Sequence, residues 1–337
     1  MILLEHNISL KSLNTFAIDV NAENLIAIYH EAGLFEVIAK KLCPIRILGG
    51  GSNILLTGDL VGYTLKNEIK GIEIIDEDEN QIMIKVGAGE KWHQFVMWSI
   101  SHNLGGIENL SLIPGSVGAA PMQNIGAYGV EQESVFHSLN AVHMANGEKK
   151  LFFKDECNFG YRESIFKKEL KDQYFITHVN YILRKKDHSL QLDYGAIRDT
   201  ILKNGIESPD VQNISDAVIE IRKSKLPDPN LIGNAGSFFK NPVIQKTLYH
   251  SLKNIHPEIP CYPISETTVK VPAGWLIEKS GFKGKTFNKI GVHKDQALVL
   301  VNYGGGCGKD ILDLAFEIKK VVKDKFKIDI EPEVNIW

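Results

Sequence analysis

Length, composition and charge already exclude several classes of protein. The chain has 337 residues, and its 38 Lys and Arg residues are nearly balanced by 41 Asp and Glu, which gives a formal net charge of −3. This length predicts two or three domains with hydrophobic cores. The charges are interspersed and form no basic face for nucleic acid. The apolar start is interrupted at Glu5, and no apolar stretch reaches the roughly 20 residues that span a bilayer, so we expect a cytoplasmic protein without a signal peptide.

The four cysteines indicate neither a disulfide framework nor a metal centre. Cys43, Cys157, Cys261 and Cys307 lie far apart, without a Cys-x-x-Cys pair or a matching histidine spacing. We therefore predict free thiols and no bound metal.

The first third of the chain mixes helical and strand patterns. Hydrophobic spacing predicts a helix over 24–32, a buried strand over 45–48 and a short strand over 53–56. A strand is predicted next over 81–86, and a helix over 91–103 whose apolar residues share one face and which a glycine ends. This mixture predicts an α/β or α+β fold.

The middle of the chain contains a long loop, a strand and a helix before a linker. Residues 110–129 hold six glycines and prolines, which is more than a simple connection needs, and long irregular loops are usually functional. A strand is predicted over 175–183, and Ser215 is expected to cap a short helix ending near Lys223. The proline-rich linker at 226–229 then predicts a domain boundary between about 205 and 230.

The last part of the chain is predicted to return to α+β structure. We expect a strand over 296–302 and an amphipathic helix from Asp310 to Phe326. A final strand over 327–330 would then place Glu333 just beyond a buried element, where its carboxylate is partly removed from water.

Several glycine-rich stretches could bind phosphate, and they differ in how well they match known phosphate-binding motifs. The run from Gly49 to Asn53 lies between two predicted strands and fits either an anion cradle of backbone N–H groups or a tight hairpin. The stretch 87–92 has Trp92 where a dinucleotide fingerprint needs its third glycine. The stretch 303–310 lacks the first glycine and the hydroxyl residue of a P-loop, so we interpret it as an ordinary loop before a helix.

Three further segments combine small residues with polar groups. Residues 111–129 allow close backbone approach to a ligand and supply amide and phenol groups for hydrogen bonds. In Gly160-Tyr161-Arg162 the arginine can face a carboxylate, although a surface turn is an alternative. In 233–242 the glycines permit a sharp bend that presents Ser237, and ordinary turn chemistry fits this segment equally well.

Taken in order, these motifs resemble the UDP-N-acetylenolpyruvoylglucosamine reductase (MurB) family. The resemblance extends from about residue 14 to the end and rests on the following segments: Asn14-Thr-Phe, Gly49-Gly-Gly-Ser-Asn, Ile113-Pro-Gly-Ser-Val-Gly-Ala-Ala-Pro, Gln123-Asn-Ile-Gly-Ala-Tyr-Gly, Gly160-Tyr-Arg, Lys225-Leu-Pro-Asp-Pro, Gly233-Asn-Ala-Gly-Ser-Phe-Phe-Lys-Asn-Pro, Ala273-Gly-Trp-Leu-Ile and Glu331-Pro-Glu-Val. It implies an FAD-dependent, NADPH-driven reduction of UDP-N-acetylglucosamine enolpyruvate to UDP-N-acetylmuramate in cytoplasmic peptidoglycan precursor synthesis.

The resemblance also implies the fold and the domains. It predicts an α+β protein with a two-part FAD-binding domain of the vanillyl-alcohol-oxidase (PCMH) type and a carboxyl-terminal substrate-binding domain. The implied FAD-binding subdomains are 1–66 and 67–212, the substrate-binding domain is 213–326, and a carboxyl-terminal strand over 327–337 carries Glu333.

Carried over residue by residue, the resemblance implies a complete set of site residues. Ser237 becomes the proton donor, with Arg162 and Glu333 at the substrate carboxylate. The residues implied to bind FAD are Gly49, Gly50, Gly51, Ser52, Asn53, Pro114, Gly115, Ser116, Gly118, Asn124, Gly126, Ala127 and Tyr128. The residues implied to bind the UDP-sugar are Tyr161, Tyr194, Arg222, Lys225, Asn241, Tyr262, Lys270 and Gln296. Tyr194 suggests the type I subtype with a tyrosine loop, and Asn335 departs from the arginine that the family usually has there.

Two alternatives remain open at this point. The chain fits another FAD-dependent oxidoreductase of the same fold class, although residues 46–66 and 105–129 hold no histidine or cysteine to attach FAD covalently. A nucleotide-sugar binding protein without catalysis is the second alternative, and the joint presence of the serine, arginine and glutamate disfavours it.

Overall fold

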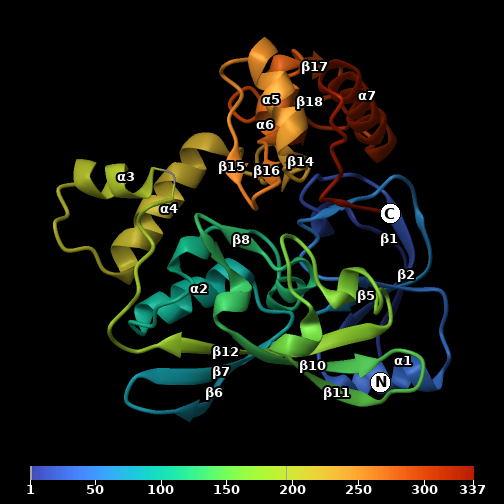
Figure 1. The fold of residues 1–337 in the computed structure, drawn as a ribbon. Helices are drawn as coiled ribbons and strands as arrows, with labels where there is room; N and C mark the ends of the chain where they lie inside the picture. Colours follow the sequence, from blue (N-terminus) through green and yellow to red (C-terminus); the bar gives the residue numbers. More distant parts are fainter. Residues whose placement is uncertain (1, 195) are drawn as a thin grey trace. The chain divides into compact units, whose positions relative to one another are not determined.

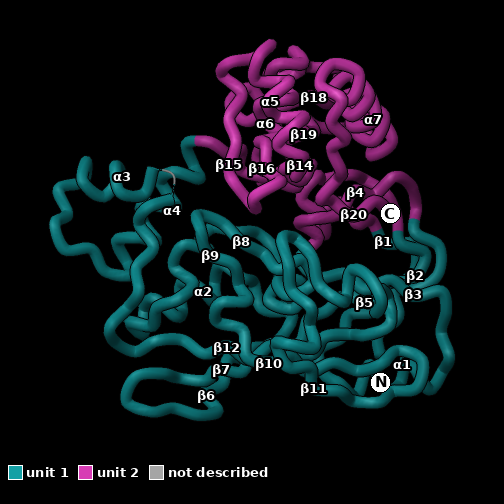
Figure 2. The backbone as a smooth tube through the Cα atoms, viewed as in Figure 1, with its two compact units in different colours: residues 1–8, 22–50, 60–224 teal, residues 9–21, 51–59, 225–337 magenta. Residues whose placement is uncertain are grey.

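The computed structural model describes residues 2–194 and 196–337, which form two compact units (Figure 2). Unit 1 contains residues 1–8, 22–50 and 60–224, and unit 2 contains residues 9–21, 51–59 and 225–337. Each unit therefore gathers segments that are far apart in the sequence. The predicted division into two FAD-binding subdomains, a substrate-binding domain and a carboxyl-terminal strand stays a prediction.

The first sheet of unit 1 has four strands in the order β1-β2-β5-β3. Its elements are β1 (Leu4–Ser9), β2 (Asn21–Ile28), α1 (Glu31–Ala39), β3 (Ile45–Leu48) and β5 (Leu60–Asn67). Strands β2 and β3 both pair in parallel with β5, and α1 contributes Leu34 and Val37 to the core. The predicted strand over 45–48 is confirmed.

The predicted helix over 24–32 is wrong, because its first half belongs to β2. Leu25, Ile26 and Ile28 are all buried in this interior strand. A parallel strand covered on both faces shows a continuous apolar run, and periodicity alone does not separate such a run from a buried helix.

The second sheet of unit 1 has five antiparallel strands in the order β11-β10-β12-β7-β6, with α2 over one face (Figure 1). Its elements are β6 (Ile72–Glu77), β7 (Gln81–Gly87), α2 (Trp92–Ser101), β10 (Phe136–His143), β11 (Lys149–Phe153) and β12 (Tyr174–Arg184). Trp92, Phe95 and Tyr181 are fully buried between helix and sheet. The strands predicted over 81–86 and 175–183 and the helix over 91–103 are confirmed.

The predicted long loop is a chain of short turns. It contains the 3₁₀ turns η2 (Glu108–Leu110), η3 (Val117–Ala119), η4 (Pro121–Gln123) and η5 (Gln132–Ser134) and the strands β8 (Gly126–Ala127) and β9 (Val130–Glu131). Two further turns, η6 (Lys154–Cys157) and η7 (Ile165–Lys167), follow β11.

Unit 1 ends in α3 (Ile197–Lys203) and α4 (Val211–Lys225), which share a small core. Ser215 does not cap α4, so that prediction is wrong. Asp210 and Asn213 instead exchange side-chain to backbone hydrogen bonds of 2.8 and 3.0 Å and form a capping box. Ser215 lies inside the helix, and its buried hydroxyl contacts the Ser111 hydroxyl at 2.8 Å.

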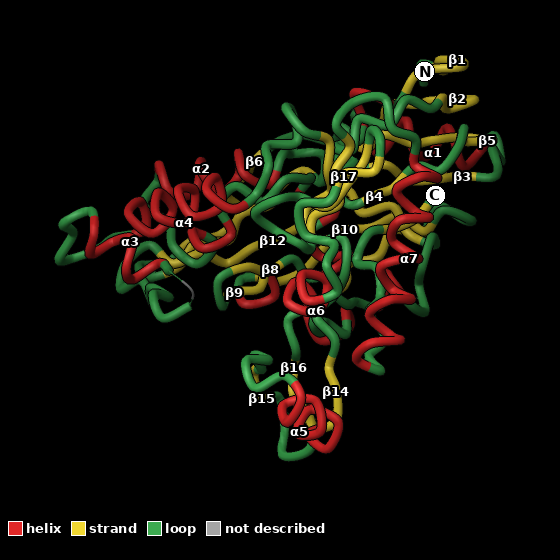
Figure 3. The backbone as a smooth tube through the Cα atoms, turned by 90° about the horizontal axis from the view of Figure 1, so that it is seen from above, coloured by secondary structure: helices red, strands yellow, loops and turns green. Residues whose placement is uncertain are grey.

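Unit 2 is built around a four-stranded antiparallel sheet in the order β13-β19-β18-β17. Its elements are η1 (Lys11–Leu13), β13 (Gly233–Ser237), α6 (Ala273–Lys279), β17 (Thr286–Phe287), β18 (Ile290–Val292), β19 (Val299–Asn302) and α7 (Gly308–Phe326). A second cluster, visible in Figure 3, contains β14 (Val243–Gln245), α5 (Lys246–Ile255), β15 (Tyr262–Pro263) and β16 (Thr268–Lys270). The short strands β4 (Ile54–Leu55) and β20 (Asn335–Ile336) pair in parallel.

In the carboxyl-terminal third one predicted strand is shorter in the structure, the predicted helix is present, and the other predicted strand is absent. Strand β19 covers only the second half of the predicted 296–302, because Gln296 and Val299 close a turn first. Helix α7 matches its prediction closely and begins where a Cβ on Gly308 would collide with the Leu56 carbonyl. The predicted strand over 327–330 is wrong, since Lys327 has a left-handed backbone that ends α7, and among the described residues the tail first forms strand pairing at the Pro332 bridge to Phe239 and then in β20.

Candidate functional site

In unit 1 two glycine loops approach each other too closely for side chains. A Cβ atom on Gly50 would lie 2.6 Å from the Gly115 Cα and 2.9 Å from the Ser116 nitrogen. A Cβ on Gly49 would lie 2.8 Å from the Ser116 Oγ. The two predicted phosphate-binding stretches therefore meet, and glycine is needed because backbone faces backbone.

The polar groups at this meeting point fit a phosphate-bearing ligand. The Ser116 hydroxyl is buried and has no hydrogen-bond partner among residues 2–194 and 196–337. A buried hydroxyl without a partner is costly, so a ligand oxygen would stabilise it. The Lys66 ammonium donates to the Gly49 carbonyl at 2.7 Å and pairs with Glu68 at 3.1 Å, which adds a cation beside the same loop.

Arg162 lies elsewhere in unit 1, where several groups fix its orientation. Its backbone has φ = +57°, a left-handed conformation that is uncommon outside glycine and that marks a constrained residue. Its guanidinium donates to the Gly126 carbonyl at 2.5 Å and lies 3.7 Å from the Glu131 carboxylate. Asn124, also left-handed, donates to the same Glu131 at 3.0 Å. The Gly160–Arg162 motif and the Asn124–Ala127 motif are thus one cluster.

Tyr128, Tyr194 and Arg222 form a second polar cluster in unit 1. The rings of Tyr128 and Tyr194 meet edge to face at 6.5 Å. Burial raises the pKa of the Tyr128 phenol, while the nearby Arg222 opposes that shift. The Arg222 Nε is buried and has no partner within the described ranges 2–194 and 196–337. Burial also lowers the pKa of Arg222, so a ligand anion at this guanidinium would offset its lost hydration.

In unit 2 a β-bulge presents Ser237. Strands β13 and β19 shift register between Asn234 and Ser237, and Gly236 between them has φ = +68°. The Asn234 side chain shapes the bulge by accepting the Gly236 N–H at 3.0 Å and donating to the Ile232 carbonyl at 2.8 Å. Bulges redirect a side chain out of the regular alternation, which accounts for the asparagine and glycine before the serine.

The carboxyl-terminal tail brings Glu333 next to this bulge. The Glu333 N–H donates to the Phe238 carbonyl at 2.8 Å, and the Lys240 N–H donates to the Glu331 carbonyl at 2.9 Å. These antiparallel contacts place Glu333 directly beside the residue that follows Ser237. Unit 2 therefore joins two of the three predicted catalytic residues, which are almost a hundred positions apart in the sequence. Arg162 belongs to unit 1.

Gly51, Ser52 and Asn53 belong to unit 2, although they continue the Gly49–Gly50 loop. A Cβ on Gly51 would collide with the Leu13 carbonyl. Asn53 donates to the Glu333 carbonyl at 3.2 Å and accepts both the backbone and the side-chain N–H of Asn335 at 3.0 Å. Asn335, the departure from the usual arginine, thus anchors the tail that carries Glu333.

The remaining predicted ligand residues of unit 2 lie mainly around β14, β15 and β16. Lys270 pairs across the strands with Val243 on one side and Tyr262 on the other, and the Tyr262 side chain is 52% exposed. Asn241 accepts the Ala273 N–H at 2.9 Å and so caps the start of α6. Gln296 accepts the Leu298 N–H at 3.3 Å, and Lys225 is exposed.

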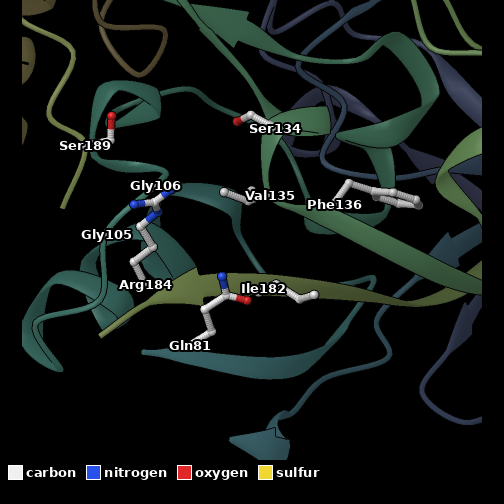
Figure 4. Close-up of a pocket in the computed structure, with 9 residues that line it drawn as sticks. All are labelled: Gln81, Gly105, Gly106, Ser134, Val135, Phe136, Ile182, Arg184 and Ser189. Atoms are coloured by element: carbon white, nitrogen blue, oxygen red, sulfur yellow. The ribbon is translucent and has the colours of Figure 1, made fainter. Parts of the chain in front are cut away.

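Figure 4 shows a cavity on unit 1. It has a volume of about 260 Å³ and lies next to Gly105, Gly106, Arg184 and Gln81 at the ends of β7 and β12. None of the predicted site residues lines it. The described residues contain no group of three or more metal ligands, and no helix among them is long and apolar enough to cross a membrane.

Three residues near the clusters were not predicted. Lys66 ends a strand without any motif around it, and His93 follows a tryptophan in an ordinary amphipathic helix. Glu131 comes two residues after the Gln123–Gly129 motif, and its adjacency to that motif is the one signal that could have identified it.

Comparison with known proteins gives relatives over the whole chain. Residues 32–150 match the model of an FAD binding domain, and residues 228–337 match the UDP-N-acetylenolpyruvoylglucosamine reductase carboxyl-terminal domain. The UDP-N-acetylenolpyruvoylglucosamine reductase of Flavobacterium johnsoniae is 50% identical, and that of Pseudomonas aeruginosa 44% identical, with 99% of each pair of chains covered. The crystal structure of the Thermus caldophilus enzyme has the same fold, with a TM-score of 0.70, 23% identity and complete coverage of both chains. The predicted arrangement of an FAD-binding domain before a carboxyl-terminal domain, with mixed helices and strands, is confirmed.

Proposed function

This chain belongs to the UDP-N-acetylenolpyruvoylglucosamine reductase family, and we propose that unit 1 supplies its cofactor cradle and unit 2 its proton donor. The protein is an FAD-dependent oxidoreductase that uses NADPH to reduce UDP-N-acetylglucosamine enolpyruvate to UDP-N-acetylmuramate in peptidoglycan precursor synthesis. A different FAD oxidoreductase and a binding protein without catalysis are thereby both disfavoured. We place the reaction in the cytoplasm, as the family resemblance implies.

The observation that carries the cofactor proposal is the buried Ser116 hydroxyl between the two glycine loops. Among the described residues this hydroxyl has no partner, and the loops face each other through backbone rather than side chains. Backbone N–H groups from such loops suit the pyrophosphate of FAD, and Ser116 would donate to one of its oxygens. When bound, FAD supplies the two-electron, hydride-transfer chemistry of the reduction.

The chemistry left to the protein is to stabilise charge and deliver one proton. As the enolpyruvyl double bond is reduced, negative charge grows at the carbon next to the carboxylate, which shares it. Arg162 would stabilise this charge, as preorganised polar groups do, and Glu333 would do so in its protonated form as a hydrogen-bond donor, because an ionised carboxylate would repel the growing charge. Ser237 would then donate its Oγ proton to the carbon, since a carbanion is basic enough to take a proton from a positioned hydroxyl.

The UDP-sugar would be bound by polar residues that the family resemblance implies, some of them in unit 1 and some in unit 2. Lys225, Lys270 and Arg222 supply three cations for its phosphates and carboxylate, and the buried Arg222 Nε supports this assignment because it lacks a partner in the described chain. Tyr194 lies next to Tyr128 and Gly129, as a tyrosine that covers a ligand would. The other proposed contacts are Tyr161, Asn241, Tyr262 and Gln296.

The proposal is tested with the purified protein. Its absorbance spectrum should show flavin, and acid precipitation should release the flavin into the supernatant, because the candidate loops offer no residue for covalent attachment. NADPH oxidation should then depend on added enolpyruvyl UDP-sugar. The Ser116→Ala variant should bind FAD more weakly than the exposed control Ser101→Ala. Equal FAD affinity of the two variants would remove Ser116 from the cradle.

A further inference from the structure

The segment that leads into the cofactor cradle contains a strained leucine held by a histidine. Leu112 has φ = +58°, a left-handed backbone conformation that costs a leucine about 1–2 kcal/mol. Its N–H donates to the Nδ1 atom of His93 at 2.9 Å. Since Nδ1 accepts this hydrogen bond, the imidazole is neutral and carries its proton on Nε2.

The same end of α2 fixes the segment at several other points. The Trp92 indole donates to the Leu110 carbonyl at 3.0 Å, and the Trp92 N–H donates to the Gly115 carbonyl at 3.0 Å. Lys91 and Ser116 form an isolated β-bridge. The hydrogen bond of His93 lies between these contacts and holds the residue where the chain turns against its steric preference.

We propose that His93 is a positioning residue for FAD binding. His93 holds Leu112 in its left-handed conformation and so places Gly115 and Ser116 where they can bind the pyrophosphate. The inference rests on the proposed role of the Gly115–Ser116 cradle. His93 acts through the backbone of the segment and touches neither the substrate nor the reacting atoms.

The surroundings of His93 favour the neutral imidazole that this role requires. Burial lowers its pKa first, and Arg222 and Lys223 of α4 lower it further. The segment 110–115 has no titratable side chain, and His93 is the only titratable residue within α2. The pKa of His93 in the ordered state lies below its ordinary value near 6.5. The stabilisation of the Leu112 conformation by the neutral imidazole is therefore complete above about pH 6.5 and is lost as the pH falls towards the lowered pKa.

The experiment measures the FAD dissociation constant of the apoprotein by flavin fluorescence. The His93→Phe variant lacks the acceptor and leaves the Leu112 N–H unpaired, so its dissociation constant should rise by about tenfold. The His93→Asn variant places an amide oxygen near the position of Nδ1 and should recover most of the affinity. The His102→Phe variant, at the residue that directly follows α2 and is exposed, is the matched control and should bind like the parent.

Two further measurements keep the inference testable if His93→Phe does not fold. Nitrogen NMR of the imidazole should find Nδ1 without a proton at pH 7.5. The FAD affinity of the parent should fall below about pH 6.5 more steeply than that of His93→Asn. A proton on Nδ1, parallel pH profiles, unchanged affinity in His93→Phe, or His93→Asn as weak as His93→Phe would each overturn the inference. Failure of the parent itself to bind FAD would instead contradict the proposed function.

Discussion

Gly50 in unit 1 and Gly236 in unit 2 each lie next to proposed site residues of their own unit, but the backbone needs them for different reasons. A Cβ on Gly50 would lie 2.6 Å from backbone atoms of Gly115, whereas a Cβ on Gly236 would meet nothing within 4 Å. Gly236 is required by its conformation, φ = +68°, which L side chains rarely adopt. One glycine makes room between two loops, and the other bends a single strand.

This difference extends to how the two units form their parts of the site. In unit 1 the glycine loops 49–50 and 115–116 are held by contacts with Lys91, Trp92 and Lys66, and the groups that we propose for FAD there are mainly backbone N–H. In unit 2 the bulge before Ser237 and the tail before Glu333 are held by asparagine side chains, at Asn234 and Asn53. We therefore expect changes in the glycine loops of unit 1 to affect FAD binding, and changes at the bulge and tail of unit 2 to affect the chemical step.

The largest effect is expected for Ser237→Ala. Loss of the hydroxyl removes the proposed proton donor, so oxidation of the reduced flavin by substrate should slow by about 10²–10⁴-fold, while FAD binding and reduction by NADPH persist. Flavin absorbance times the two half-reactions separately. The Ser251→Ala variant, exposed on α5, is the control. Flavin reoxidation at the parent rate would reassign Ser237 to a structural role in the bulge.

The Gly50→Ala substitution in unit 1 should affect FAD binding rather than the chemical step. Its methyl group must displace the Gly115 backbone, so FAD affinity should fall about 100-fold, equivalent to about 2.7 kcal/mol. Gly58→Ala is the matched control, because a Cβ there meets nothing within 4 Å and the backbone is not left-handed. Titration of apoprotein with FAD gives both constants. If both variants bound FAD equally, the close approach of the loops would not matter for the cofactor.

The sequence proposes candidate site residues from local composition, whereas it predicts only part of the fold that positions them. Ser237 and Ser116 stand in glycine-rich segments of unusual composition, so the sequence alone proposes both as site residues, and their roles stay predictions. The helix α2 was also predicted, because its apolar residues repeat with helical spacing. Strand β2 was missed, since its continuous apolar run fits a buried helix as well as a buried parallel strand.

Other features depend on pairing between distant segments and have no local signal. Residues 9–21 and 51–59 join unit 2 through contacts such as those of Asn302 with Phe16 and of Asn335 with Asn53. The left-handed backbone of Leu112 and Arg162 is set by partners in α2 and in the 124–131 segment. Local sequence patterns therefore propose candidate chemical groups, but they do not show which distant residues hold those groups in place.

A smaller effect is expected when the orientation of Arg162 is disturbed through its neighbour. Glu131→Gln keeps an oxygen for Asn124 but removes the charge that faces the guanidinium at 3.7 Å. We expect kcat to fall about tenfold, with a smaller change in KM and normal FAD affinity, because the loss is felt mainly as charge develops. Glu133→Gln, two residues away, is the control. An equal loss in both variants would point to general disturbance of the segment rather than to positioning of Arg162.

The smallest effect is expected for Gly236→Ala, the counterpart of Gly50→Ala. The open surroundings of Gly236 mean that the methyl group meets no atom within 4 Å, so the cost is the left-handed backbone alone, about 1–2 kcal/mol in the free energy of unfolding. FAD affinity should not change, and the rate of flavin reoxidation should fall only to the extent that the bulge changes its backbone conformation.

The Gly236→Asn variant distinguishes a requirement for left-handed backbone from a requirement for a small side chain, because asparagine tolerates left-handed backbone better than alanine although it is larger. Urea unfolding should therefore rank the parent above Gly236→Asn and Gly236→Asn above Gly236→Ala. The reverse order of the two variants would show that space, and not backbone conformation, requires glycine before Ser237.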